Sequence, residues 1–86
     1  MDVPDAEVPG WENSAGFLSR EWTFRDFSEA FGFMTRVALI AEQLHHHPNW
    51  TNTWNHVTIA LTSHDDGGIS ELCVEFAQRV NRLLGE

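Results

Sequence analysis

The stretch that organises the chain runs from Glu42 to His64 and reads EQLHHHPNWTNTWNHVTIALTSH. It contains all five histidines of the protein, three of them adjacent at positions 45–47. Pro48 follows this run and ends any helix before it, because proline has no backbone N–H to donate. One helical pattern leads into the stretch and another follows it. Histidines gathered where elements meet are more typical of a functional site than of a core.

The size and charge of the chain limit its classes of function. A single domain of 86 residues buries only about 60–65% of its unfolded surface, so association is a natural supplement to its core. The formal net charge is −8, with five arginines and no lysine, which argues against nucleic acid and anionic membranes as partners. No apolar run approaches the about 20 residues of a membrane span.

The one cysteine of the chain, Cys73, cannot form an internal disulfide. An unpaired cysteine suits a reducing compartment, so we expect a cytoplasmic protein. Because Cys73 falls within a helical pattern, we predict a small packed residue rather than a reactive thiol.

The first part of the chain is predicted to contain a hairpin. Residues 1–10 carry two prolines, three acids and a glycine, and we expect them to be a poorly ordered lead-in to one domain at residues 11–86. Short strands are predicted at 11–13 and 17–24 with a turn between them. In the second strand Arg20 falls on the same face as apolar residues.

A long helix is predicted to follow, from a capping box at Asp26 and Glu29 to the histidine run. Its apolar residues cover more than one face: Phe27, Ala30, Phe31, Phe33, Met34, Val37, Ala38, Ile40, Ala41 and Leu44. Two arrangements fit so wide a stripe. Either the whole stripe is intramolecular core, or one edge packs on the protein's own sheet and another edge on a partner chain.

The second half repeats the order of the first. In the run that ends at His64, Val57, Ile59 and Leu61 share one face, and a two-residue turn is expected at 55–56. The DDGG sequence at 65–68 predicts a loop, after which Ser70 caps a final helix that ends at Gly85. The predicted fold class is therefore α+β, a two-layer ββαββα fold whose four-stranded antiparallel sheet carries the helices on one face.

The adjacent histidines allow several interpretations. A cation at a helix C-terminus interacts favourably with the helix dipole, and we favour this role for His45. His47 precedes proline, which pushes its backbone into an extended form, so His46 and His47 are expected to point in different directions. Together with Asp65 and Asp66 the histidines could bind zinc or nickel. HExxH, CxxC and HxxxH spacings are absent, however, and we expect no metal site.

Acid–base catalysis without a metal is the interpretation that we favour. Imidazole, with an ordinary pKa near 6.5, both gives and accepts protons at neutral pH. Trp50 and Trp54 are candidates to face a flat ligand, although most tryptophans are simply buried. The residues alone indicate a hydro-lyase or an isomerase and go no further.

The pattern as a whole resembles a known family. Its elements are Glu42, His46-His47-Pro48, Trp50, Asn52, Trp54-Asn55, Val57, Ile59, Leu61 and His64, then Gly68-Ile69-Ser70, with EAFGFM at 29–34 in the first helix. From about Trp11 onward this order is similar to that of the pterin-4a-carbinolamine dehydratases. Departures are the short segment before Trp11, where the family commonly has a helix, and Gln43, His45 and Asn49, where other residues are frequent.

The resemblance implies dehydration of a 4a-hydroxytetrahydropterin to the quinonoid dihydropterin, a step of tetrahydrobiopterin biosynthesis, with no metal or organic cofactor. It implies catalytic roles for His46, His47 and His64. The substrate contacts that it implies are Glu42, His46, His47, Pro48, Trp50, Ser63, His64, Asp65 and Asp66. It also implies a homodimer or homotetramer.

The alternative is a non-catalytic dimerisation or assembly partner that keeps the fold. Some relatives of this family are assembly factors, including one kind for RuBisCO, and such relatives tend to have lost catalytic histidines. The intact set at positions 46, 47 and 64 favours the enzyme.

Overall fold

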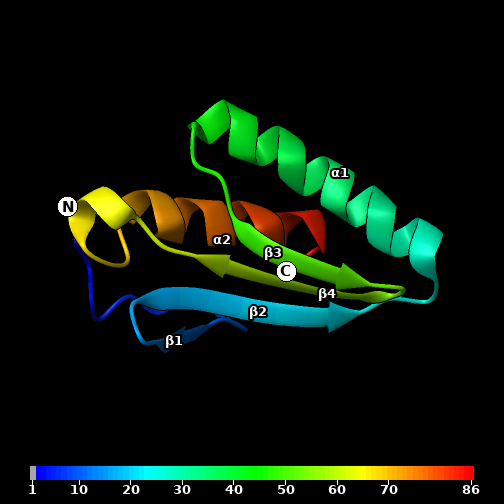
Figure 1. Cartoon of the computed structure of the whole chain (residues 1–86), viewed down its shortest axis with the longest axis horizontal. Helices are drawn as coiled ribbons and strands as arrows, with labels where there is room; N and C mark the ends of the chain where they lie inside the picture. The colour runs from blue at the N-terminus through cyan, green and yellow to red at the C-terminus, as the bar shows by residue number, and fades with distance from the viewer. Residues whose placement is uncertain (1) are drawn as a thin grey trace.

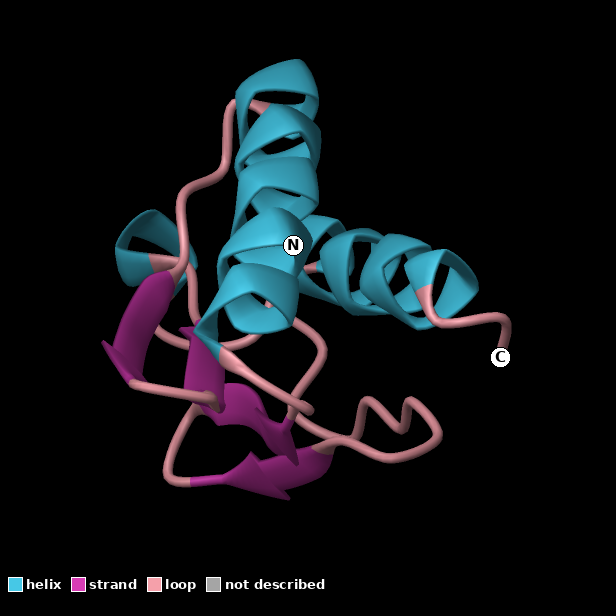
Figure 2. Ribbon diagram, turned by 90° about the vertical axis from the view of Figure 1, so that its right-hand side faces the viewer, coloured by secondary structure: helices cyan, strands magenta, loops and turns pink. Residues whose placement is uncertain are grey.

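The computed structural model describes residues 2–86 and contains four strands and two α-helices joined by short connections. Their order is β1 (Glu12–Ser14), β2 (Phe17–Thr23), α1 (Phe27–Leu44), β3 (Asn49–Thr53), β4 (His56–Leu61), the 3-10 turn η1 (His64–Asp66) and α2 (Glu71–Leu83). The strands form one antiparallel sheet in the order β1-β2-β4-β3, and both helices lie on one face of it (Figures 1 and 2). The predicted α+β fold class is confirmed.

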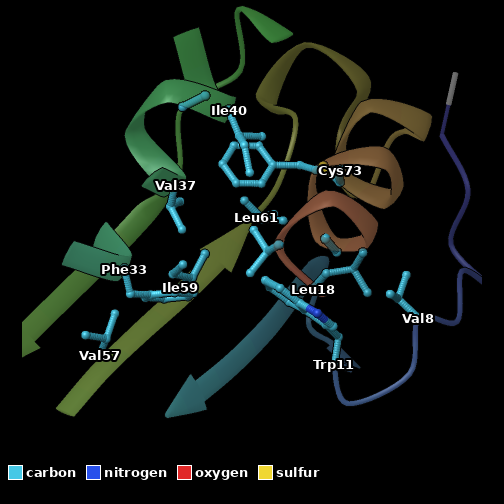
Figure 3. Packing of buried hydrophobic residues seen from close by; sticks show 14 of the residues in the cluster. Val8, Trp11, Leu18, Phe33, Val37, Ile40, Val57, Ile59, Leu61 and Cys73 are labelled. Atoms are coloured by element: carbon cyan, nitrogen blue, oxygen red, sulfur yellow. The ribbon is translucent and has the colours of Figure 1, made fainter. Parts of the chain in front are cut away.

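The core lies between the helices and the two central strands, β2 and β4. Leu18 of β2 pairs with Leu61 of β4, and the alternating residues Val57, Ile59 and Leu61 are fully buried, as their period of two predicts. Figure 3 shows these side chains meeting Phe33, Val37 and Ile40 of α1 and Cys73 of α2. Burying one such apolar side chain is worth about 1.5–3 kcal/mol.

Arg20 lies on the core-facing side of β2 because it has partners at the C-terminal end of α2. Its Nη1 donates to Oδ1 of Asn81 at 2.8 Å and to Oε1 of Glu86 at 2.9 Å, and its Nη2 donates to Oε2 of Glu86 at 2.8 Å. The guanidinium also lies over the ring of Trp22. The Arg20 hydrogen bonds lower the pKa of Glu86 from its ordinary value. The charged exception in the strand pattern is thus a paired residue at the rim of the core.

Residues 2–10 lie against α2 and the loop before it. Val3 N donates to Ile69 O at 2.7 Å, Val8 is buried, and Asn81 Nδ2 donates to Pro9 O at 2.9 Å. No pattern in residues 1–10 predicted this packing of the expected lead-in. Met1, its first residue, lies outside the described residues.

Several element boundaries differ from the predicted ones: β1 begins and ends one residue later than expected, and β2 ends one residue earlier. The β3–β4 turn is made by Trp54 and Asn55, not by Asn55 and His56, because Trp54 takes a left-handed backbone at φ 51° and His56 pairs within β4. Asn52 stabilises this turn, since its Nδ2 donates to the carbonyls of Trp54 and His56, each at 3.0 Å. The run predicted to reach His64 as a strand ends at Leu61.

Helix α1 begins at the predicted capping box, where Glu29 N donates to Oδ1 of Asp26 at 2.8 Å. Its wide apolar stripe is divided. Five residues face the core, namely Ala30, Phe33, Val37, Ile40 and Ala41. Phe27 and Phe31 are 49% and 57% exposed, so the wholly intramolecular arrangement is wrong for them.

Candidate active site

A cavity of about 590 Å³ opens where the C-terminal end of α1 meets the connection from β4 to α2, both at the left in Figure 1. Its walls come from these two segments and the first turn of α2. The lining residues are His45, His46, His47, Thr62, Ser63, His64, Asp65, Asp66, Ser70, Glu71 and Leu72. The cavity therefore brings His46 and His47 together with His64, although they belong to separate elements.

The end of α1 redirects the chain toward the cavity. His45 takes a left-handed backbone at φ 51°, and its N–H donates to Glu42 O at 3.3 Å, while His46 N donates to Ala41 O at 3.1 Å. These two bonds are those of a Schellman motif, a common way to end a helix. The helix stops at Leu44, so the three histidines follow it instead of forming its last turn.

His46 is the most enclosed of the three expected catalytic residues. Its Nε2 lies 3.3 Å from Sγ of Cys73, and its ring meets that of Phe76 edge-on at 6.2 Å between centroids. Burial lowers the pKa of His46 below its ordinary 6.5, and the neighbouring charge of His47 lowers it further. At pH 7 the His46 imidazole is therefore neutral and able to accept a proton.

His47 is more exposed and is held by an acidic partner. Its Nε2 lies 3.1 Å from Oε1 of Glu42, one turn back in α1. A carboxylate only accepts hydrogen bonds, so the proton in this contact is on Nε2 of His47. Nδ1 is then the ring nitrogen left to exchange a proton with a ligand.

His64 is presented by a short closed loop. Ser63 and Gly68 exchange backbone hydrogen bonds, with Ser63 N donating at 2.7 Å and Gly68 N donating at 3.2 Å. Gly67, at φ 74°, ends η1 and donates its N–H to His64 O at 3.2 Å. The loop thereby fixes His64 and the two aspartates after it in the lining of the cavity.

The cavity contains most, but not all, of the predicted site. Six predicted residues line it, namely His46, His47, Ser63, His64, Asp65 and Asp66. Glu42 reaches the site only through His47. Pro48 and Trp50 do not line the cavity, and Trp50 instead packs against the hydrophobic core.

Several cavity residues were not predicted. Ser70, Glu71 and Leu72 reach the lining as the start of α2, and the N-cap signal at Ser70 was the one sequence feature that could have located them. Cys73 is fully buried, as predicted for a packed residue, but its contact with His46 had no signal in the sequence.

Residues 2–86 contain no group of three histidine, cysteine or carboxylate side chains arranged to hold a metal ion. Neither helix of this part of the chain is long and apolar enough to cross a bilayer.

The family match and the similar proteins of known sequence all indicate one family. Residues 3–83 match the family described as pterin 4 alpha carbinolamine dehydratase. A protein of Synechococcus sp. (strain WH7803) with the provisional name pterin-4-alpha-carbinolamine dehydratase is 57% identical over 76 residues, 88% of this chain and 82% of its own. A protein of Rhizorhabdus wittichii with the same provisional name is 51% identical over 84 residues, 95% of this chain and 86% of its own.

Two solved structures have a similar fold. A transcriptional coactivator/pterin dehydratase from Brucella melitensis superposes with a TM-score of 0.82 at 40% identity, covering 87% of this chain and 82% of its own. A pterin dehydratase-like protein identified as a RuBisCO assembly factor in the alpha-carboxysome superposes with a TM-score of 0.72 at 23% identity, covering 88% of each chain. The second likeness is one of fold alone. The match over residues 3–83, with relatives about half identical over most of their length, places this chain in the pterin 4 alpha carbinolamine dehydratase family.

Proposed function

We propose that this protein is a hydro-lyase that dehydrates a 4a-hydroxytetrahydropterin to the quinonoid dihydropterin by histidine acid–base catalysis. One observation carries the proposal: His46, His47 and His64, from two segments well separated in sequence, line a single cavity. Family membership supports the substrate class. We keep the cytoplasm as the expected compartment and a homodimer or homotetramer as the expected assembly.

The reaction needs two proton transfers. A donor protonates the 4a-hydroxyl as its bond to C4a breaks, and an acceptor takes the proton from N5 as the C4a–N5 double bond forms, so that water leaves. His46, neutral at pH 7 because its pKa is lowered, suits the acceptor. His47 and His64 are then the candidate donors, and one proton exchanged with solvent returns the set to its starting state.

The other cavity residues suit recognition of a pterin ring. The carboxylates of Asp65 and Asp66 accept hydrogen bonds and can receive the ring's amino and amide N–H groups. Ser63 offers a hydroxyl on the same wall. Glu42 orients His47 through their 3.1 Å contact, and Pro48 follows that histidine directly and restricts its backbone.

The test replaces each histidine separately. We expect His46→Ala, His47→Ala and His64→Ala to lower the dehydration rate of a synthetic carbinolamine by about 10²–10⁴-fold, the usual contribution of a general acid or base. The matched control is His56→Ala. His56 lies on β4 outside the cavity, where it contacts Thr23 and Glu21, and its loss should leave the rate unchanged. Unchanged turnover in all three cavity variants would contradict the proposal.

A second candidate function is that of an assembly partner. Phe27 and Phe31, whose rings contact each other, and Leu39 leave apolar surface exposed on α1, as a protein-binding surface requires. The fold shared with the RuBisCO assembly factor makes this candidate concrete. An inactive purified protein that forms a stable complex with RuBisCO subunits would favour it over the enzyme.

A further inference from the structure

A chain of hydrogen-bonding side chains lies behind the cavity and is not used by the proposed proton transfers. It links His46 to Cys73, Ser70 and Ser63. Besides its 3.3 Å contact with His46 Nε2, Cys73 Sγ lies 3.5 Å from Oγ of Ser70 and 3.6 Å from Oγ of Ser63, and the two hydroxyl oxygens are 2.6 Å apart. Cys73 is fully buried and does not line the cavity, so it is not placed to attack a ligand.

Each member of the chain is fixed by the fold. Ser70 is the N-cap of α2, and its Oγ accepts a hydrogen bond from Cys73 N at 3.4 Å. Ser63 is held by its backbone bonds with Gly68. The thiol therefore has a defined position, and the end of α1 places His46 in contact with it.

Thiols and hydroxyls differ from carboxylates in a way that matters for an acid–base residue. A carboxylate only accepts, so beside an imidazole it favours the protonated form, whereas S–H and O–H groups both donate and accept. When Nε2 of His46 is unprotonated, the Cys73 thiol can donate to it. When Nε2 carries a proton, the sulfur can accept, and the thiol proton can turn to a serine oxygen. These side chains therefore give Nε2 of His46 a hydrogen-bond partner both with and without its proton.

We propose that Cys73, supported by Ser63 and Ser70, is a positioning residue that holds the His46 ring through Nε2 and leaves Nδ1 to exchange protons with the ligand. The effect of Cys73 on catalysis rests on the proposed function, whereas its effect on the position of the His46 ring does not. In the neutral ring expected at pH 7, Nε2–H donates to Sγ of Cys73, and Nδ1 keeps the lone pair that accepts the ligand's proton. The other titratable groups around His46 are His45, His47, His64, Asp65, Asp66 and Glu71.

The ring geometry is tested by ¹⁵N NMR of the histidine side chains in the full-length protein. In the unmodified protein we expect one tautomer of neutral His46 and a hydrogen-bonded Nε2 signal. Cys73→Ala should mix the tautomers and move that signal, while Cys73→Ser, which keeps a donor and acceptor, should preserve most of the original pattern. Val80→Ala is the packing control. Val80 is equally buried on α2, but it neither lines the cavity nor belongs to the hydrogen-bonded set of Cys73, Ser63 and Ser70. A His46 spectrum that Cys73→Ala leaves unchanged would overturn the proposal.

Kinetics of the same variants separate the two proposals. Cys73→Ala should lower kcat for dehydration by about tenfold or more and change KM by less than about twofold, the loss expected when a general base is misaligned. Cys73→Ser should recover most of kcat. If the unmodified protein has no dehydratase activity but shows the NMR response, the proposed function fails and the positioning role stands. If Cys73→Ala keeps full kcat in an active enzyme, the positioning role is refuted.

Discussion

His46 combines partial burial, a neighbouring imidazole and a thiol partner, and the first two determine when it carries charge. Its pKa is lowered in the folded protein, first by burial and then by His47. In the unfolded chain the same group titrates at its ordinary value of 6.5. Between these two values the unfolded chain binds more protons, so this residue destabilises the fold as pH decreases from about 6.5 and has no such effect above it.

Replacing His47 tests this electrostatic account directly. In His47→Gln the neighbouring charge is gone, so the pKa of His46 should rise toward 6.5 but remain below it, since burial is the larger cause. NMR titration of the His46 ring measures the change, with His56→Gln as a control outside the cavity. A His46 pKa that falls, or that does not move, would show that His47 does not exert the assigned effect.

Asn81 is the buried polar residue that joins three parts of the chain. Its Oδ1 accepts from Trp11 Nε1 and Arg20 Nη1, both at 2.8 Å, and its Nδ2 donates to Pro9 O. Asn81→Ala leaves the buried Trp11 N–H without its acceptor. We expect a loss of about 2–3 kcal/mol in the free energy of unfolding, measured by urea denaturation.

The control for Asn81 is Gln78→Ala, on the exposed side of the same helix. Surface substitutions of this kind change stability by less than about 0.5 kcal/mol. Equal midpoints for the two variants would mean that the hydrogen bonds of Asn81 do not contribute to stability.

At the scale of elements, the end of α1 depends on a histidine in a conformation that favours glycine. A left-handed backbone costs an L-residue roughly 1–2 kcal/mol, and His45 adopts it at φ 51°. His45→Gly should stabilise the protein by about 0.5–1 kcal/mol, the relief of strain exceeding the extra freedom of glycine in the unfolded chain. Thermal unfolding measures this gain. His45→Ala also removes the imidazole but keeps the strain, so it should give no such gain, and equal melting temperatures would contradict the explanation.

How far the sequence predicts an element depends on whether its signal is local. The alternation in β4, the capping box at Asp26 and the cap at Ser70 are local, and each was predicted correctly. The β3–β4 turn was placed one residue late because a tryptophan rarely takes a left-handed backbone, and Asn52 stabilises it from within the strand.

The site was predictable to the extent that the family pattern covers it. That pattern named the three histidines and the loop after β4, and the structure brings them to one cavity. The contact of His46 with Cys73, by contrast, depends on where α2 packs against the end of α1. No spacing rule relates two residues that meet only through tertiary structure, so this contact appears only in the folded protein.

For the molecule as a whole, the exposed apolar side of α1 predicts self-association. A chain of 86 residues gains stability by covering such a surface. Phe31→Glu would place a charge in this surface, so we expect the oligomer to dissociate toward monomers in sedimentation velocity. Gln43→Glu adds the same charge elsewhere on α1 and should not change the assembly. A monomeric unmodified protein would refute self-association.

The pairing of β2 with β4 has a consequence for how the protein acquires activity. These neighbours are joined through α1 and β3, so Leu18 meets Leu61 only after about half of the chain has closed into a large loop. Closing such loops is slow compared with forming a helix or a hairpin. A nascent chain with α1 and the β3–β4 hairpin already formed still lacks the packed α2 against which His46 rests. Ligand binding should therefore recover in the last kinetic phase of refolding, so its recovery reports when the fold is complete.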